Sequence, residues 1–320
     1  MCTSIAFQTK DFYFGRNMDL DEPFGERVLI TPRRFPIAFR HEKELKSHYA
    51  MIGIAAGGEN YPLYAEAANE KGLCMAGLNF SGNACFSDEC RSGSHNIATY
   101  ELIPWLLASC ADVEEACALL AKTNVTGEPY REGMPAASLH WHIADKKGSV
   151  VLEIMEDGMH IHRNPAGVVT NNPPFSFHLM NLNCYLNLTP EYPENRFQKE
   201  LSLKPVGMGM GTMGMPGDAS PISRFVRAAF YRANSVCGTK ERESVSQLFH
   251  ILDGVGMVKG AVRNPEGKCV YTTYACCINA EKGIYYYKTY EDSCIRYAAM
   301  EEADMEKEHL VEAAARPWIE

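Results

Sequence analysis

The sequence lacks the features that mark membrane-spanning, secreted and nucleic-acid-binding proteins. No apolar run approaches the roughly 18 residues that a transmembrane helix needs. The first residues contain no positively charged segment followed by an apolar one, so no secretory signal peptide is expected. The net charge of −9 argues against nucleic acid or an anionic membrane as a partner. Together these absences predict a cytoplasmic protein without membrane attachment.

Cysteine is abundant, but its spacing is not that of a disulfide framework. The chain has 12 cysteines at irregular spacing and contains no CxxC pair. Cys276 and Cys277 are adjacent in an apolar, strand-like run, so their side chains would point to opposite faces of the strand. Buried free thiols in a reducing compartment explain this pattern best. Such a compartment would also keep a catalytic cysteine reduced.

Two histidine pairs and one glycine-rich segment resemble binding motifs without the context that these motifs require. His140-Trp141-His142 and His160-Ile161-His162 each put two imidazoles on one strand face, but no third zinc ligand is evident. Residues 209–214 satisfy GxGxxG, yet no clear apolar strand precedes them and no helix follows. We therefore expect neither a metal nor another cofactor.

The second residue is the strongest candidate for a catalytic group. Removal of Met1 would leave Cys2 with a free α-amine beside its own thiol. The reference pKa values are about 8.5 for the thiol and about 7.7–8.0 for the amine. Nucleophile and general base would then share one residue. An ordinary cysteine next to the initiator methionine is the alternative that these residues alone leave open.

Residues 2–19 are predicted to form a β-hairpin that carries this terminus into a sheet. Apolar residues alternate at Ile5 and Phe7, a polar turn follows at 8–11, and three aromatic residues begin the second strand. That strand ends in the segment GRNMD, where Arg16 would favour a thiolate and Asp19 would accept a hydrogen bond from the protonated amine. A surface Arg–Asp pair is the alternative.

The remaining elements predict an α+β fold in one domain, because antiparallel strands lie at both ends and helices lie between them. Strands are predicted at 27–31, 48–56, 73–79, 138–144, 149–154, 159–163, 167–170, 271–279, 283–290 and 293–299, and helices at 99–110, 112–122, 177–188, 221–236 and 244–252. Residues 189–220 are rich in Pro, Gly and Met. We expect this long excursion to be functional or to form an interface.

Blocks of sequence follow the hairpin along nearly the whole chain. They are NEKGL at 69–73, AGLNF at 76–80, LHW at 139–141, VTNNP at 169–173, GMPGD at 214–218, SRF at 223–225 and EKGIYYY at 281–287. With Cys2-Thr3 and GRNMD, these blocks resemble the choloylglycine hydrolase family of N-terminal-nucleophile hydrolases, which contains bile salt hydrolases and penicillin V acylases. The resemblance implies a four-layer αββα sandwich of two antiparallel sheets, formed by a single domain at 2–320 after loss of Met1.

The resemblance also implies a set of catalytic residues: Cys2, Arg16, Asp19, Asn79, Asn171 and Arg224. Cys2 would be the nucleophile and its amine the proton shuttle, while Asn79 and Asn171 would stabilise the oxyanion. A lone asparagine at a strand end is otherwise a turn former. On a helical wheel Arg224 points away from the apolar stripe, which by itself indicates an exposed charge.

The implied reaction is hydrolysis of conjugated bile salts, the amides of bile acids with glycine or taurine, in the bacterial cytoplasm. Transfer of the acyl group to other amines would follow naturally from a thioester intermediate. By position in the family, the steroid groove would be lined by Met18, Leu20, Ala65, Tyr130, Met134 and Leu139, although core packing explains these residues nearly as well. The family further implies a homotetramer, with the Met-rich run 208–215 as a contact surface.

Two other functions stay open at this stage. Penicillin V acylase activity uses the same nucleophile, but in that branch of the family the position of Asn79 is commonly tyrosine, so asparagine favours bile salts. A protein that binds bile acids without turning them over is the second alternative. The intact set of Cys2, Arg16 and Asp19 argues against it.

Overall fold

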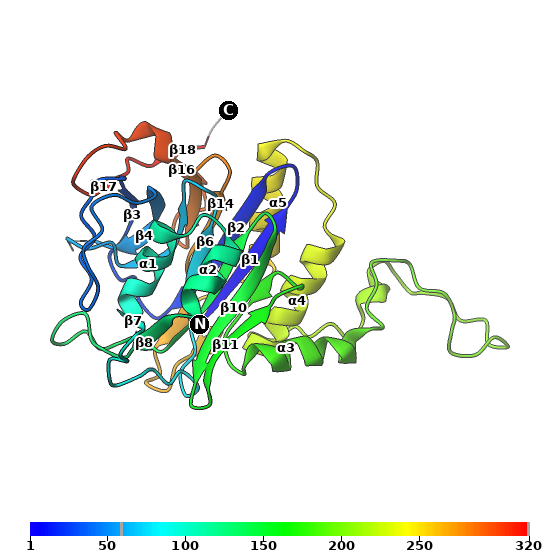
Figure 1. The fold of residues 1–320 in the computed structure, drawn as a ribbon. Helices are drawn as coiled ribbons and strands as arrows, with labels where there is room; N and C mark the ends of the chain where they lie inside the picture. Colours follow the sequence, from blue (N-terminus) through cyan, green and yellow to red (C-terminus); the bar gives the residue numbers. More distant parts are fainter. Residues whose placement is uncertain (58–59, 319–320) are drawn as a thin grey trace.

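The computed structural model describes residues 1–57 and 60–318 (Figure 1). One sheet contains β1 (Cys2–Gln8), β2 (Phe12–Leu20), β12 (Val168–Val169), β13 (Val262–Arg263), β14 (Cys269–Asn279), β15 (Ile284–Thr289), β16 (Arg296–Ala299) and β18 (Arg316–Pro317). The other contains β3 (Glu26–Thr31), β4 (Met51–Ala56), β5 (Tyr64–Asn69), β6 (Cys74–Asn79), β9 (Leu139–Asp145), β10 (Gly148–Met155), β11 (Gly158–Arg163) and β17 (Val311–Glu312). A small parallel pair is formed by β7 (His95–Ala98) and β8 (Thr123–Thr126).

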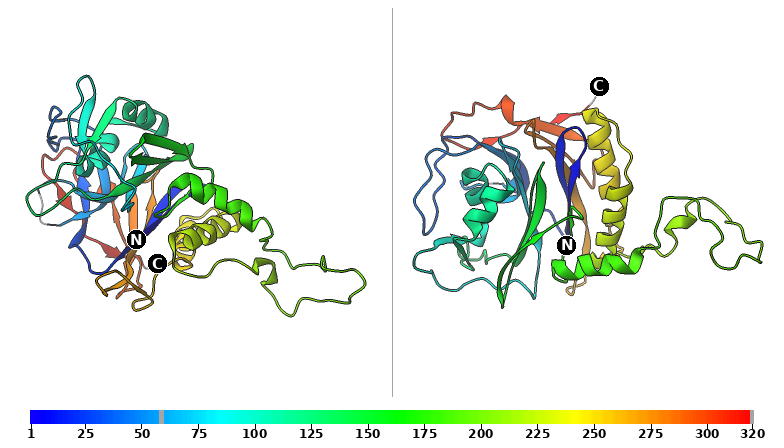
Figure 2. Two further views of the ribbon diagram at one scale, coloured as in Figure 1. Left: turned by 90° about the horizontal axis from the view of Figure 1, so that it is seen from below. Right: turned by 45° about the vertical axis from the view of Figure 1, so that its right-hand side comes forward.

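The helices cover the outer faces of the two large sheets. They are α1 (Leu102–Ser109), α2 (Val113–Leu120), α3 (Phe175–Asn181), α4 (Pro221–Asn234) and α5 (Glu241–Asp253), with short 3-10 turns η1 (Thr99–Glu101), η2 (Leu182–Tyr185), η3 (Met210–Thr212) and η4 (Met300–Glu302). In the right-hand view of Figure 2, α1 and α2 lie outside one sheet and α4 and α5 lie outside the other. The four-layer αββα sandwich of antiparallel sheets is thereby confirmed.

The first sheet is built around the N-terminal hairpin. Its strand order is β12-β1-β2-β14-β15-β16-β18, with β13 joined to β14, and the other sheet runs β11-β10-β9-β6-β5-β4-β3-β17. Strand β1 pairs with β2 from Cys2↔Met18 to Gln8↔Phe12, so the predicted hairpin is confirmed. Because β2 also pairs along its length with β14, the hairpin lies inside the sheet, where its position is held on both sides.

The chain passes from one sheet to the other between β11 and β12. The sequence predicts a strand at 167–170 after those at 138–144, 149–154 and 159–163, but only the first three, β9, β10 and β11, pair with one another in series. Instead β12 pairs with β1 through Ser4↔Val169 and Ile5↔Val168. This crossing brings Asn171 next to the N-terminus.

The helix that follows β12 and the strand β5 both differ from the sequence prediction. The helix predicted at 177–188 begins at Phe175, ends at Asn181 and continues as the 3-10 turn η2. Strand β5 was not predicted, because its sequence YAEAAN is rich in alanine and lacks the branched residues typical of strands. Its backbone is nevertheless held between β4 and β6.

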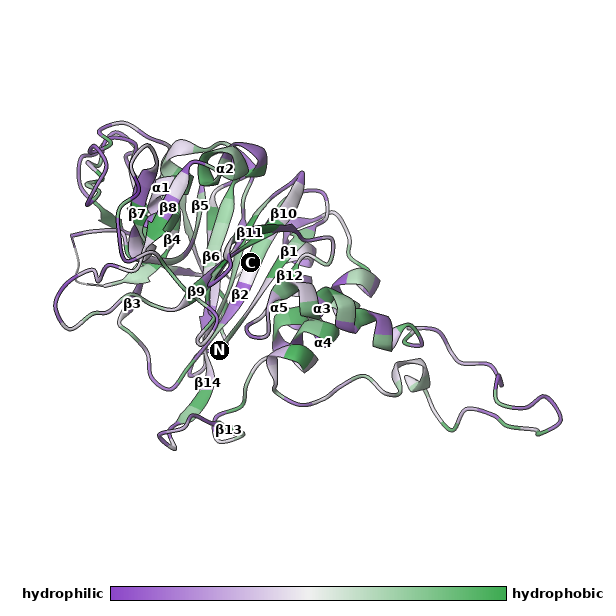
Figure 3. Cartoon of the chain, turned by 60° about the horizontal axis from the view of Figure 1, so that its bottom comes forward, coloured by the Kyte–Doolittle hydropathy of each residue, from purple (hydrophilic) through white to green (hydrophobic). Residues whose placement is uncertain are grey.

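Residues 189–220 extend away from the body of the molecule (Figures 1 and 3). Large apolar side chains in this excursion are exposed, including Phe197 at 85%, Val206 at 93% and Met208 at 96%. The GxGxxG segment lies here and neither follows a strand nor begins an α-helix, so the rejection of a dinucleotide motif is consistent with the fold. Within the described part of the chain, no helix combines the length and the apolar character that crossing a bilayer requires.

Candidate active site

Cys2 begins β1 and is almost completely buried, with 3% of its surface exposed. Its Sγ accepts a hydrogen bond from Nη2 of Arg16 at 2.7 Å and lies 3.8 Å from the sulfur of Met18. The hairpin register produces this contact, because Arg16 and Met18 are on the same face of β2 as the thiol of the paired strand. A cation at this distance stabilises a thiolate.

The Arg16 side chain is fully buried between the sheets. Its Nη1 donates to the carbonyls of Gly77 at 2.9 Å and Ala65 at 3.2 Å, and to the Glu66 carboxylate at 3.2 Å. Burial lowers the pKa of the Arg16 guanidinium, but the neighbouring Cys2 and Glu66 more than offset this and raise it above its ordinary value. The group is therefore a permanent cation beside the sulfur.

The chain nitrogen of Cys2 lies beside Asn171, and the preceding Met1 lies beside Asp19. The Cys2 N–H donates to Oδ1 of Asn171 at 2.8 Å, and the amino group of Met1 donates to the backbone carbonyl of Asp19 at 2.6 Å. The Asp19 carboxylate accepts a hydrogen bond from Thr272 at 2.6 Å, whereas its Oδ2 is buried without a hydrogen-bond partner among the described residues. Burial raises the pKa of Asp19, and the charge of Arg224 opposes the rise.

Arg224 reaches this site from the first turn of α4. Its Nη1 donates to the Cys2 carbonyl and to Oγ1 of Thr3, each at 2.6 Å, and its Nη2 donates to Oδ1 of Asn171 at 2.8 Å. The exposed charge indicated by the helical wheel is therefore wrong, since Arg224 is fully buried. The reason is that the helix begins against the hairpin, so the sheet covers the face that the wheel assigns to solvent.

The two asparagines meet at the ends of their strands. Nδ2 of Asn171 donates to the backbone carbonyl of Asn79 at 2.8 Å. Asn79 itself is exposed at the end of β6, while Asn171 is buried. Imidazoles hold the backbone on both sides of this contact, because His140 bonds the Thr170 carbonyl at 3.0 Å and His178 bonds the Asn171 carbonyl at 2.9 Å.

A pocket of about 290 Å³ is lined in part by Ala65, whose backbone carbonyl accepts a hydrogen bond from Arg16. Four of the six residues expected to line a substrate groove line it, namely Ala65, Tyr130, Met134 and Leu139. Met18 and Leu20 are not among its lining residues: Met18 contacts the Cys2 sulfur, and Leu20 is half-buried against the core. The other lining residues are mainly apolar or aromatic: Phe24, Ala56, Leu63, Tyr64, Thr99, Tyr100, Ile103, Pro135, Ala136, Ala137 and Trp141.

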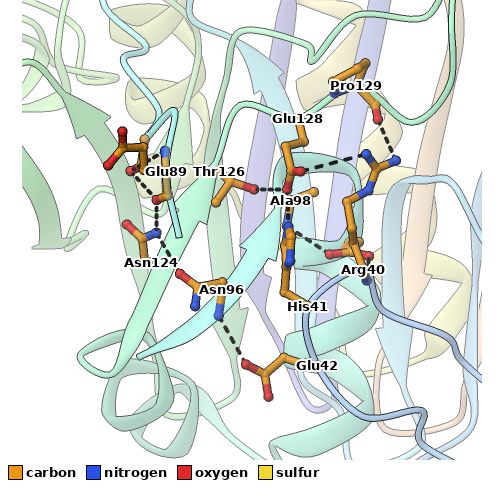
Figure 4. A network of polar contacts seen from close by, with 12 residues as sticks. Arg40, His41, Glu42, Glu89, Asn96, Ala98, Asn124, Thr126, Glu128 and Pro129 are labelled. Atoms are coloured by element: carbon orange, nitrogen blue, oxygen red, sulfur yellow. Dashed lines mark hydrogen bonds and ion pairs between the residues drawn. The ribbon is translucent and has the colours of Figure 1, made fainter. Parts of the chain in front are cut away.

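A polar network attaches the loop that carries Tyr130 and Met134 to the segment after β3 (Figure 4). Arg40 donates to the Pro129 carbonyl at 2.9 Å, and His41 lies 2.6 Å from the Glu128 carboxylate. Thr126 donates to the same carboxylate at 3.0 Å. The rim of the pocket is thus held by contacts between two segments, 40–41 and 126–129.

Three residues at the site were missed by the sequence analysis. Glu66 binds Arg16, Thr272 binds Asp19, and His178 binds the backbone of Asn171. Glu66 lies in β5, which was not predicted, and its burial has no local signal. Side chains alternate between the two faces of a strand. The Glu66 carboxylate could therefore have been placed inside the sandwich only if β5 had been recognised as a strand between its two neighbours.

The histidine pairs have structural contacts in place of a third ligand. His142 bonds Ser4 at 2.8 Å, and burial lowers its pKa to about 3, so it is neutral. His160 and His162 stack on each other with centroids 5.9 Å apart. No group of three or more His, Cys, Asp or Glu side chains in the described residues is arranged to hold a metal ion.

The described geometry matches a known family. Residues 2–313 match the family of linear amide C–N hydrolases, choloylglycine hydrolase family. The chain is 44% identical to a bile salt hydrolase/transferase of Lactiplantibacillus plantarum, over 97% of this chain and 96% of that protein. It is 40% identical to a bile salt hydrolase/transferase of Clostridium perfringens, over 97% and 94%.

Solved structures give the same result. The C2A mutant of the conjugated bile acid hydrolase from Clostridium perfringens superposes with a TM-score of 0.90 at 36% identity, over 98% of this chain and 96% of that chain. Penicillin V acylase from Agrobacterium tumefaciens has a TM-score of 0.73 at 21% identity, over 97% and 90%, and shares the fold. A buried cysteine at position 2, an arginine at its sulfur and these full-length matches establish the assignment: the chain belongs to the choloylglycine hydrolase family and is an amide C–N hydrolase.

Proposed function

We propose that this enzyme hydrolyses the amide bond that joins a bile acid to glycine or taurine. The observation that carries the proposal is the position of the Cys2 sulfur, 2.7 Å from Arg16, whose other nitrogen bonds the carbonyl of Ala65 in the wall of an apolar pocket. A steroid needs such a pocket, and the Cys2 thiolate can attack the carbonyl of an amide whose acyl part is bound there. The relatives named as bile salt or conjugated bile acid hydrolases support the same substrate.

The reaction begins once Met1 has been removed and the nitrogen of Cys2 has become a free amine. The thiolate attacks the amide carbonyl, and the carbon–nitrogen bond breaks as the protonated amine gives its proton to the departing amino acid. Asp19 holds the amine, and Asn79 and Asn171 stabilise the oxyanion. The side-chain carbonyl of Asn171 accepts a hydrogen bond from the Cys2 nitrogen, which supports the placement of Asn171 beside the reacting groups.

The thioester formed in this step is then cleaved. Water gives a proton to the amine as it attacks the thioester, which releases the bile acid and restores the thiolate. A different amine in place of water would yield a new conjugate. The relatives from Lactiplantibacillus plantarum and Clostridium perfringens are named hydrolase/transferase, which supports acyl transfer as a second activity.

The proposal includes the state of the mature protein. Residues 2–320 form a single domain, and the protein is a homotetramer in the bacterial cytoplasm. The exposed apolar residues of the 189–220 excursion support the assembly, since side chains such as Val206 and Met208 need a covering surface. Free cysteines support a reducing compartment, because none of those in the described residues is in a disulfide.

The test compares substrates and two substitutions of Cys2. Release of glycine and taurine from conjugated bile salts is measured beside hydrolysis of penicillin V, for the wild type, Cys2→Ala and Cys2→Ser. We expect bile salts to be preferred by the wild type, Cys2→Ala to lose every activity, and Cys2→Ser to fold but to turn over far more slowly, because its alkoxide is much harder to form. Retained hydrolysis in Cys2→Ala would overturn the mechanism, and tight bile-acid binding without turnover by the wild type would favour a binding protein.

A further inference from the structure

A buried carboxylate lies behind the arginine of the active site. Glu66 is completely buried in the centre of β5. Its Oε2 accepts hydrogen bonds from Nη1 of Arg16 at 3.2 Å and from the Tyr274 hydroxyl at 2.9 Å. Its Oε1 accepts hydrogen bonds from the Tyr285 hydroxyl and from the Cys276 thiol, the latter at 3.7 Å. Glu66 does not contact the Cys2 sulfur and reaches it only through Arg16.

These contacts fit an ionised carboxylate. Burial raises the pKa of Glu66, and Arg16 together with the two tyrosine hydroxyls opposes that rise. Burial also raises the pKa of Tyr274 and Tyr285 far above the ordinary value, so both hydroxyls keep their hydrogens and donate. A protonated Glu66 would put its own hydrogen against one of these donors. The carboxylate form satisfies all of them.

We propose that Glu66 is a positioning residue that compensates the charge of Arg16 and thereby sets the pH at which Cys2 becomes a thiolate. The inference rests on the proposed role of Cys2 as the nucleophile. The Arg16–Glu66 pair is neutral as a unit, so the guanidinium acts on the sulfur mainly as a directed hydrogen-bond donor. Without the carboxylate, Arg16 would present a full uncompensated charge to the sulfur.

That charge would change the sulfur in two ways. An uncompensated cation favours the thiolate, so the thiol would ionise at lower pH. A more acidic thiol is also a weaker nucleophile once it is ionised. Glu66 therefore keeps the thiolate reactive as well as held in place. Several charged and titratable groups surround Cys2 and the Arg16–Glu66 pair. They are Asp19 from β2, Tyr274 and Cys276 from β14, Tyr285 from β15, Arg224 from α4 and the amino terminus.

The experiment measures the thiol directly in full-length protein whose loss of Met1 is verified by mass spectrometry. The rate of Cys2 alkylation by iodoacetamide is followed on the N-terminal peptide as a function of pH, because the chain has 12 cysteines. For Glu66→Gln we expect the midpoint of the profile to fall by about one pH unit. The plateau rate should fall about threefold, as the nucleophilicity of thiolates follows their basicity. An unchanged or raised midpoint would overturn the proposal.

Two variants control for the substitution itself. Glu66→Asp keeps the charge and should restore the wild-type midpoint. Glu153→Gln neutralises another completely buried carboxylate, which bonds His140 instead of Arg16, and should leave the midpoint unchanged. If Glu153→Gln lowered the midpoint as much as Glu66→Gln, the effect would not be specific to Arg16 and the proposal would fail.

A third variant keeps the proposal testable if Glu66→Gln does not fold. Tyr285→Phe removes one hydrogen-bond donor from the Glu66 carboxylate, so more of its negative charge acts on Arg16 and the midpoint should rise. No rise would contradict the proposal. The alkylation profile needs no bile salt. A protein that shows the expected shifts but releases no glycine or taurine would therefore disprove the proposed function and leave the role of Glu66 intact.

Discussion

At the scale of single residues, the site depends on which groups surround one sulfur and one nitrogen. The Cys2 sulfur has Arg16 at 2.7 Å, and the Cys2 nitrogen has Oδ1 of Asn171 at 2.8 Å. With Met1 present this nitrogen is an amide, which donates a hydrogen bond but cannot accept a proton. The amino group of Met1 also donates a hydrogen bond to the backbone carbonyl of Asp19. The proton shuttle that the mechanism needs therefore exists only after processing.

We expect protein that retains Met1 to be inactive. A variant with an uncleavable extension before Cys2 should release no glycine or taurine, because residue 2 then has no amine to move protons. Intact-mass spectrometry identifies the two forms, and thermal unfolding serves as the control for folding. Full turnover by protein shown to keep Met1 would refute this expectation.

At the scale of elements, the hairpin must come close to the helix that covers it. Gly15 lies in β2 opposite α5, and a Cβ built there would be 2.5 Å from the carbonyl of Cys276 and 3.0 Å from Leu248. Only glycine allows this approach. The close packing fixes the position of the hairpin, and with it that of Arg16, relative to β14 and α5.

Gly15→Ala should lower the free energy of unfolding by about 1–3 kcal/mol, which is typical of overpacking. The measurement is urea denaturation followed by circular dichroism. Gly148→Ala is the matched control, because nothing lies within 4 Å of the added Cβ in that strand. It should change the free energy of unfolding by no more than about 0.5 kcal/mol. Equal stability of Gly15→Ala and the wild type would be inconsistent with the packing described.

The start of α4 gives a prediction that depends on pH. Hydrogen bonds from Ser220 and Ser223 lower the pKa of Asp218 to about 2. Since the folded pKa is below the unfolded one, which is about 3.9, the stabilisation is present above the unfolded pKa and is lost as pH falls towards about 2. Asp218→Asn should therefore be less stable than the wild type at pH 6.

This difference should shrink at pH 3, and urea denaturation at the two pH values checks it. A difference of the same size at both values would show that the carboxylate charge is not involved. Arg224 directly follows Ser223 in the first turn of α4. The hydrogen bonds to Asp218 therefore also help to hold the arginine at Cys2.

At the scale of the whole molecule, two observations concern surfaces. The pocket is lined mainly by residues of β4, β5 and β9, of η1 and α1, and of the loop fastened by Arg40 and Glu128, all within one chain. The excursion at 189–220 instead presents apolar side chains outward. A large exposed apolar surface of this kind is typical of an interface.

Substituting Phe197, Val206 and Met208 together by serine should reduce the molecular mass in solution, as measured by light scattering after size exclusion. These residues are exposed in the single chain, and the proposed tetramer would bury them. Val236→Ser is the control, because Val236 is 92% exposed outside the excursion. An unchanged mass for the triple variant would exclude the excursion as the assembly surface.

The sequence by itself predicted the hairpin and the placement of Arg16 beside Cys2, as well as the αββα fold through the family resemblance. The reason is that Cys2, Arg16 and Asp19 lie within one supersecondary unit, whose register follows from a period of two and a short turn. The order of the elements could be predicted as well, because apolar periodicity is local.

Only the tertiary structure decided how distant residues meet at the site, both Arg224, which the family resemblance named, and Glu66, which it did not. Arg224 bonds Cys2 across 222 positions of sequence, and Glu66 bonds Arg16 across 50. Such contacts depend on the crossing of β12, the start of α4 and the burial of β5 between its neighbours. No local pattern encodes them, because burying a charged side chain is favourable only when its partner is already in place.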